Sequence, residues 1–250
     1  DLSYRAQLKK WDFKYLEDVE TPAELPVAIS AARSQQFRWN KGAAENFQKL
    51  YGKLLKDPTV SFKTKFHSFF HLLNSSMFLL VLLVAVLSVP ILYIKNNNPN
   101  FSWYFNVIAG FAISTVIFFG CYWVTYKRIH GGGIKNFFKY IGMFFTFFSV
   151  AMGFSVHNSL AVLEGHFGKK SEFIRTPKFN ISSLSNQWKS NIYLKKRLSK
   201  NMILESLLFL YFGFAIYSAF LVNDFGLILF HLMLFAGFGF VAFKSIFSRI

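Results

Sequence analysis

The sequence predicts a mainly α-helical membrane protein, and three observations support that class. Of its 250 residues, 53% are hydrophobic and 20% aromatic, whereas only 16% are charged. The apolar residues are grouped in blocks, several of them as long as the twenty or so residues that a helix needs to cross a hydrocarbon core. The net charge is +16, and most cations outside the first 60 residues lie in short polar segments beside those blocks. This pattern favours anionic lipid headgroups as partners over nucleic acid.

Residues 1–26 are polar, and their pattern changes twice. The stretch 3–10 is typical of a helix end, whereas 12–20 alternates apolar and polar residues as a half-buried strand does. The connector 21–26 carries two prolines, the second of which can begin the next helix. The first 60 residues hold 10 Lys or Arg against 8 Asp or Glu, and they show no signal-peptide pattern. We expect them to continue a larger protein, because they are too few for an independent core.

A long amphipathic helix is predicted over residues 27–56, with Gly42 as the position where it could break. Asp57 and Pro58 should end it, because the residue before a proline disfavours helical geometry. One face of the helix is apolar and flanked by lysines, which is typical of a helix that lies on a membrane surface. The apolar residues of that face are Phe47, Leu50, Tyr51, Leu54 and Leu55.

Four segments are long and apolar enough to span a bilayer: 69–94, 103–126, 202–222 and 225–246. A fifth apolar stretch, 137–156, also passes that test. If it crossed from a cytosolic start, the nine Lys and Arg that follow it up to residue 200 would be exported. The positive-inside rule therefore favours an interfacial or re-entrant helix there, and four spans in total.

A polar and aromatic cluster precedes the first span, in the sequence SQQFRWNKG. Helical spacing of i, i+3 and i+4 makes Gln35, Arg38 and Trp39 project together. Arg offers a fixed fork of donors for a diphosphate, Gln can bridge hydroxyls, and Trp presents a flat apolar surface to a sugar ring. Spacing alone supports two interpretations equally, a glycosyl-transfer site and an interfacial helix with an aromatic anchor.

The sequence around this cluster resembles the end of the catalytic domain in processive family-two glycosyltransferases. It is most similar to plant mannan synthases and their bacterial relatives, with cellulose, chitin and hyaluronan synthases further off. The matching residues are Asp1, Leu2, Arg5, Trp11, the ELP at 24–26 and the QxxRW formed by Gln35, Arg38 and Trp39. The resemblance implies that residues 1–26 are the C-terminal remnant of a GT-A α/β catalytic domain.

A second match lies downstream, in EFIRTPK at 172–178. It is similar to the gating loop of cellulose synthases, with Phe173, Thr176 and Lys178 in register and Arg175 in place of a valine. In the family this loop follows an interfacial helix. From composition alone, the same stretch would be a basic loop that binds lipid headgroups.

The predicted organisation has five parts. They are a domain end at 1–26, an interfacial helix region with QxxRW at 27–60, a transmembrane pair at 61–126, an interfacial or re-entrant helix with the gating loop at 127–200, and a second transmembrane pair at 201–250.

The resemblance implies inverting transfer from a UDP- or GDP-hexose to a glycan or lipid acceptor, with elongation of a β-linked polysaccharide and its movement across the membrane. Gln35, Arg38 and Trp39 would bind acceptor and donor, and Thr176 and Lys178 would close over the diphosphate. Asp1 aligns with the second aspartate of a TEDxDL pattern, so the catalytic base and the ligands of a divalent cation, Mg²⁺ or Mn²⁺, are expected upstream. This segment alone is then expected to be inactive.

Two alternatives stay open, a transferase that adds one sugar to a lipid, as glucosylceramide synthases do, and a membrane module without activity. The expected location is a bacterial inner membrane, with the donor site cytosolic. His67 and His71 have metal-pair spacing but no third ligand nearby in sequence, so a metal role is less favoured. Asn74, Ser75 and Ser76 could line the glycan path, although hydrogen bonds between helices explain them better.

Overall fold

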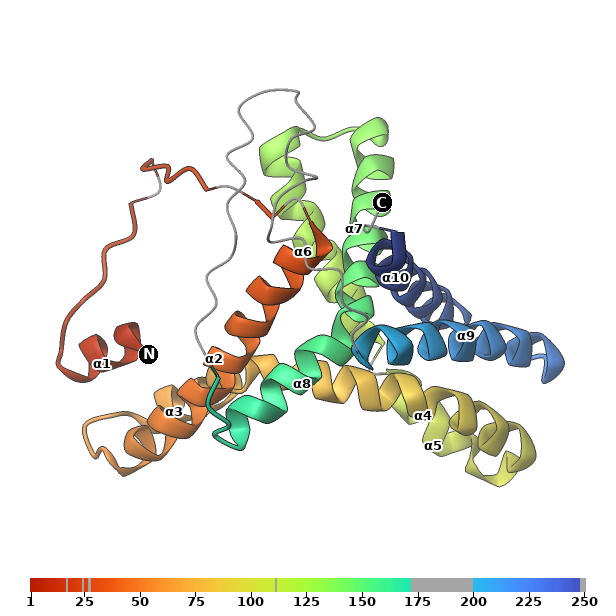
Figure 1. Ribbon diagram of the computed structural model, residues 1–250, viewed down its shortest axis with the longest axis horizontal. Helices are drawn as coiled ribbons and strands as arrows, with labels where there is room; N and C mark the ends of the chain where they lie inside the picture. The colour runs from red at the N-terminus through yellow and green to blue at the C-terminus, as the bar shows by residue number, and fades with distance from the viewer. Residues whose placement is uncertain (17, 24, 27, 111, 172–199, 248–250) are drawn as a thin grey trace. The chain divides into compact units, whose positions relative to one another are not determined.

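The computed structural model describes residues 1–250 except 17, 24, 27, 111, 172–199 and 248–250 (Figure 1). The described residues form helices and no β-strand, which confirms the mainly α-helical class. The chain divides into two compact units. The first contains residues 1–80, 156–198 and 244–250, and the second contains 81–155 and 199–243.

The first unit is built around one long helix, α2 (Ile29–Lys56), which runs without a break through Gly42. It ends at Asp57, directly before Pro58, as expected. The other elements of this unit are α1 (Leu2–Leu8), α3 (Phe62–Leu72), the 3₁₀ turn η1 (Asn74–Ser76) and, except for its first residue, α8 (Ser155–His166). In Figure 1, α3 lies along the C-terminal half of α2.

The apolar face of α2 does not lie open for a membrane surface, contrary to the prediction. Leu50 and Leu54 are buried and form a core cluster with Leu72 of α3, and Phe47 and Tyr51 pack against it. Leu55 alone of the predicted face is exposed. The sequence pattern was correct about amphipathicity, but a neighbouring helix covers an apolar stripe as well as lipid does.

The strand predicted over residues 12–20 is absent from the described part of that stretch. Its alternate side chains are exposed, with Tyr15 at 87%. A strand is stable only when another strand satisfies its backbone hydrogen bonds, and the described residues supply none. The helix predicted at 3–10 does form, as α1.

The second unit is a set of long apolar helices. They are most of α4 (Met77–Asn97), η2 (Pro99–Phe101), α5 (Ser102–Gly110), α6 (Ile113–His130), α7 (Ile134–Gly153), α9 (Lys200–Leu221) and most of α10 (Ile228–Phe247). Four stretches are long and apolar enough to cross a membrane, as predicted: Asn74–Asn97, Pro99–His130, Asn201–Leu221 and Ile228–Ile246.

The fifth apolar stretch forms two helices, α7 and α8, which bend by 53° where they meet. Length and composition would admit this pair as one further span. A bend of this size also fits a re-entrant segment, so the interfacial or re-entrant position favoured by charge remains a prediction.

Helix packing in the second unit combines apolar rings with close backbone contact. Phe212 of α9 stacks on Phe238 of α10 with ring centroids 5.5 Å apart, and both side chains are fully buried. A Cβ on Gly237 of α10 would overlap the carbonyl oxygen of Ser149 in α7, so glycine permits this approach. Ser88 of α4 and His231 of α10 form a buried hydrogen bond of 2.9 Å.

Candidate functional site

The three residues of the QxxRW motif lie in the N-terminal half of α2. Trp39 is 60% exposed, whereas Gln35 and Arg38 are half-buried. The indole therefore offers an open apolar surface. The guanidinium of Arg38 belongs to the preceding residue, and the amide of Gln35 lies about one helical turn back. That the three side chains project together, and the roles assigned to them, remain predictions.

The helix keeps this geometry because its neighbouring polar groups are satisfied locally. Asn40, directly after Trp39, is buried and donates from Nδ2 to the carbonyl oxygen of Gln36 at 2.8 Å. A side chain that bonds four residues back stays close to its own helix, so the amide of Asn40 is satisfied without a partner from another element.

Helix α8 packs against other positions of α2. His157 donates from Nε2 to the carbonyl oxygen of Arg33 at 2.9 Å, and its ring lies 5.5 Å from that of Phe37. Arg33 in turn donates from Nη2 to Ser245 at 2.9 Å. These contacts support the segment of α2 that carries the motif.

The next contact is an ion pair at Lys41. Its Nζ lies 3.2 Å from Oε2 of Glu164 and donates to Oγ of Ser171 at 2.8 Å. The other oxygen of Glu164 accepts a hydrogen bond of 2.7 Å from Lys169. The pKa of Glu164 lies below its ordinary value, first because of the hydrogen bond from Lys169 and then because of the bond from Lys41, although burial opposes both.

The last contact of this interface joins three elements at His166. Gln48 of α2 has only N–H donors at Nε2, so His166 Nδ1 accepts, at 3.0 Å. Nε2 of the same ring must then carry the proton that it donates to Ser76 Oγ of η1 at 2.8 Å. Ser76 therefore forms a contact between helices, which is the favoured one of its two predicted roles.

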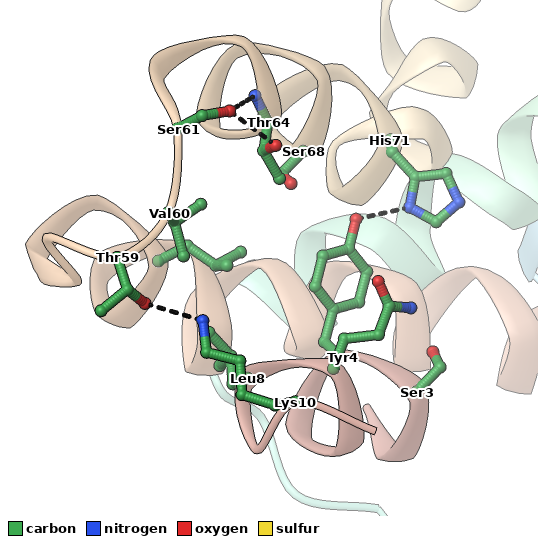
Figure 2. A pocket seen from close by; sticks show the side chains of 12 residues that line it. Ser3, Tyr4, Leu8, Lys10, Thr59, Val60, Ser61, Thr64, Ser68 and His71 are labelled. Carbon is green, nitrogen blue, oxygen red and sulfur yellow. Dashed lines mark hydrogen bonds between the residues drawn. The ribbon is translucent and has the colours of Figure 1, made fainter. Parts of the chain in front are cut away.

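Several predicted features lie elsewhere or outside the described residues. The gating residues Phe173, Thr176 and Lys178 fall in the stretch 172–199, which the structure does not describe. Nδ1 of His71 and the hydroxyl of Tyr4 share a hydrogen bond of 2.8 Å, as Figure 2 shows. Among the described residues no three His, Cys, Asp or Glu side chains could together hold a metal ion.

A cavity of about 450 Å³ lies between α1, the turn after α2 and α3 (Figure 2). Hydroxyl groups line much of it, and Lys10 reaches Thr59 across it with a hydrogen bond of 3.3 Å. None of the QxxRW residues lines this cavity. It is separate from the candidate transfer site.

Sequence reasoning missed Lys41, Glu164 and His166. Glu164 lies 123 residues beyond Lys41, so no local spacing could reveal the pair. Lys41 stands between Asn40 and Gly42 in a helix that carries several other polar and charged residues, so nothing in the local sequence distinguishes it.

The chain has relatives among plant glycosyltransferases. It is 36% identical over 94 residues to probable glucomannan 4-beta-mannosyltransferase 2 of Oryza sativa subsp. japonica, covering 36% of this chain and 16% of that protein. It is 35% identical over 97 residues to glucomannan 4-beta-mannosyltransferase 7 of Arabidopsis thaliana, covering 35% and 17%. With probable glucomannan 4-beta-mannosyltransferase 3 of rice it shares 45% identity over 67 residues, covering 27% and 12%.

The chain spans about a sixth of the length of the first two relatives. No family model and no solved structure matches it. The relatives are plant proteins, so the expectation of a bacterial inner membrane finds no support. The predicted resemblance is confirmed: over about a third of its length this chain is homologous to the glucomannan 4-beta-mannosyltransferases, which are cellulose synthase-like glycosyltransferases of family two.

Proposed function

We propose that this chain forms the acceptor-binding helix and membrane region of an inverting glycosyltransferase that elongates a β-linked polysaccharide. The observation that carries the proposal is the exposed Trp39 on α2, beside half-buried Gln35 and Arg38, in a chain related to mannosyltransferases. Four candidate spans support an integral membrane location.

In this proposal Trp39 stacks against the C–H face of the terminal acceptor sugar. The ring then fixes the acceptor hydroxyl relative to the donor, and such orientation accounts for much of the barrier reduction in a two-substrate reaction. Gln35 can donate to and accept from sugar hydroxyls or donor oxygens at the same time.

Arg38 acts on the leaving group. The departing nucleoside diphosphate gains negative charge, and a guanidinium held in a half-buried position stabilises such charge more strongly than one in bulk water. A bound divalent cation would supply further charge neutralisation.

The donor is a UDP- or GDP-activated hexose, and mannose is the first candidate because the relatives are named as mannosyltransferases. The acceptor is a growing glycan that leaves through the spanning helices. Anionic lipids are expected around the basic segments of the chain.

The test is an assay of the full-length protein in nanodiscs with Mg²⁺ or Mn²⁺. Radiolabelled UDP- and GDP-sugars are supplied one at a time, and the product is sized. A long polymer from one donor supports the proposal and identifies the sugar. A labelled lipid alone means a glycolipid transferase, and no transfer by the folded protein means a module without activity.

A further inference from the structure

Lys41 is the least expected buried residue of α2. Its exposed fraction is 5%, although it lies only two positions after the exposed Trp39. A lysine is almost never this deeply buried unless its charge is paired, because an unpaired ammonium loses several kcal/mol of hydration. Its burial therefore indicates a specific arrangement.

The partners of Lys41 account for its charge. Glu164 and Ser171 accept from Nζ, as described above, and the ring of Phe37 lies 5.8 Å from the same nitrogen. Glu164 is also bound by Lys169, whose own side chain is exposed. The carboxylate thus joins one buried cation and one solvated cation, and would keep one of them if the other were lost.

The backbones of α2 and α8 are also close at this point. A Cβ on Gly165 would lie 2.6 Å from the carbonyl oxygen of Lys41 and 2.7 Å from Cβ of Ala44. A contact this tight leaves α8 no room to slide inward, and the ion pair beside it fixes the rotation of α2. Both the distance and the rotation between the helices are therefore set near Lys41.

The interface with α8 lies on the other side of α2 from Trp39, the proposed stacking surface for the acceptor sugar. Two helical positions separate Lys41 from Trp39, which turns the side chain by about 200° around the axis. The difference in exposure, 5% against 60%, agrees with that geometry. A rotation of α2 at Lys41 would therefore move Trp39 by the same angle.

We propose that Lys41, through its ion pair with Glu164, is a positioning residue of the transfer site. It holds α2 against α8 so that Trp39 and Arg38 face the acceptor and donor at the productive angle. This proposal rests on the proposed function. Lys41 itself contacts neither substrate, and its effect is on orientation, where a misplacement of about 1 Å can cost about 100-fold in rate.

The main variant is Lys41→Met, which keeps the length of the side chain and removes its charge. Lys169 remains to pair with Glu164, so the variant should fold and insert. The matched control is Lys49→Met, because Lys49 lies on the same helix and pairs with Glu45 at 3.8 Å, but is exposed. Full-length protein in nanodiscs is assayed with the donor that supports wild-type transfer.

For Lys41→Met we expect kcat to fall by about 10- to 100-fold, while KM for the nucleotide sugar stays within about twofold. Lys49→Met should match the wild type in both. Unchanged kcat in Lys41→Met overturns the proposal. A rise in KM alone also overturns it, because that result means that Lys41 binds the donor.

A charge exchange tests the pair itself. Glu164→Lys places three cations together and should lower kcat at least as much as Lys41→Met. The double variant Lys41→Glu with Glu164→Lys restores opposite charges and should recover part of the lost kcat. Losses that simply multiply, without recovery, contradict a positioning role for the pair.

Hydrogen exchange provides a readout that does not depend on transfer. Amides of residues 156–171 should exchange faster in Lys41→Met than in Lys49→Met, because α8 has lost its fixed contact. Equal exchange overturns the proposal even if kcat falls. If the wild type transfers no sugar, the proposed function is wrong, and the positioning role in transfer is overturned with it. Faster exchange in Lys41→Met would in that case still show that Lys41 fixes the contact between α2 and α8.

Discussion

The α2–α8 interface of the first unit and the α7–α10 interface of the second are held in different ways. Between α2 and α8, an ion pair and hydrogen bonds from histidine rings lie along the contact. Between α7 and α10, Gly153 and Gly237 bring the backbones together, and the side chain of Val241 packs beside them. Both interfaces bring two helices close at a glycine, Gly165 in the first, and the first adds an ion pair and histidine hydrogen bonds to that contact.

The four candidate spans lie mostly in the second unit, and close packing at glycine fits helices in lipid. Helices in lipid gain little from the hydrophobic effect between themselves, so they associate through close packing of small residues. Charged and polar pairs that are partly buried are strong, and their geometry determines how two helices are oriented to each other. The candidate site lies in the first unit, on the helix that carries the Lys41–Glu164 ion pair. The following variants test this contrast.

The largest effect is expected for Trp39→Ala in the full-length protein. The exposed indole is the proposed stacking surface for the acceptor sugar and makes no buried contact, so without it polymer synthesis should fall by about 100-fold or more. Membrane insertion should be unaffected. The matched control is Trp103→Ala, which removes an equally exposed indole, 66% against 60%, at the start of the second candidate span. Wild-type yield from Trp39→Ala would remove the basis of the proposed function.

Gly153→Ala should destabilise the second unit by about 1–3 kcal/mol, because its new Cβ overlaps the carbonyl of Gly237 and cannot be accommodated without moving a helix. Thermal unfolding in detergent measures the change. The control on the same helix is Gly142→Ala, where a Cβ meets nothing within 4 Å and helix propensity favours alanine. If both variants unfold at the same temperature, backbone contact does not hold α7 against α10.

A smaller effect is expected from the hydrogen bond between Ser88 and His231. Double-mutant cycles between membrane helices give about 0.6 kcal/mol for such bonds. The cycle uses Ser88→Ala, His231→Phe and the double variant, with stability measured in the same detergent. A coupling energy near zero would mean that apolar packing alone holds α4 against α10.

The helices could be predicted from sequence better than their surroundings. Runs of apolar residues determined the four spans, since crossing a bilayer requires only length and hydropathy. Pro58 determined the end of α2 through local sterics. These features depend only on residues that are close in sequence, so they can be predicted without knowledge of the tertiary contacts.

Features that depend on distant residues were wrong or missed. The apolar stripe around Leu50 and Leu54 predicts that these side chains are buried. It does not predict whether lipid or another helix covers them, and in the structure Leu72 does. The strand at 12–20 requires a partner that the described residues do not provide. Lys41 and Glu164 meet only because α8 crosses α2 at Gly165, and no spacing rule contains that crossing. The site was partly predictable because Gln35, Arg38 and Trp39 lie within one helix.

The smallest effect is expected at the one connector between spans that is ion-paired in the described part of the second unit. Asp224, between α9 and α10, lies 2.6 Å from Lys95 at the end of α4. The hydrogen bond from Lys95 is the main cause that lowers the pKa of Asp224, and the backbone N–H of Gly226 adds to it, against the opposing effect of burial. A lowered pKa in the folded state means that the pair stabilises the fold above the ordinary pKa of aspartate, and that this stabilisation is lost as the pH falls through the folded value.

Because Lys95 is partly exposed, the contribution should be only about 0.2–0.5 kcal/mol. Wild-type stability should fall as the pH drops below about 4, and Asp224→Asn should be less stable at pH 7 but should lose less of its stability on acidification. Unfolding in detergent between neutral and acidic pH measures both. If Asp224→Asn shows the same acid dependence as the wild type, the loss arises from other carboxylates, Glu164 of the first unit among them. Adding Glu164→Gln then tests the ion-paired acid beside Lys41 in the first unit separately from Asp224 in the second.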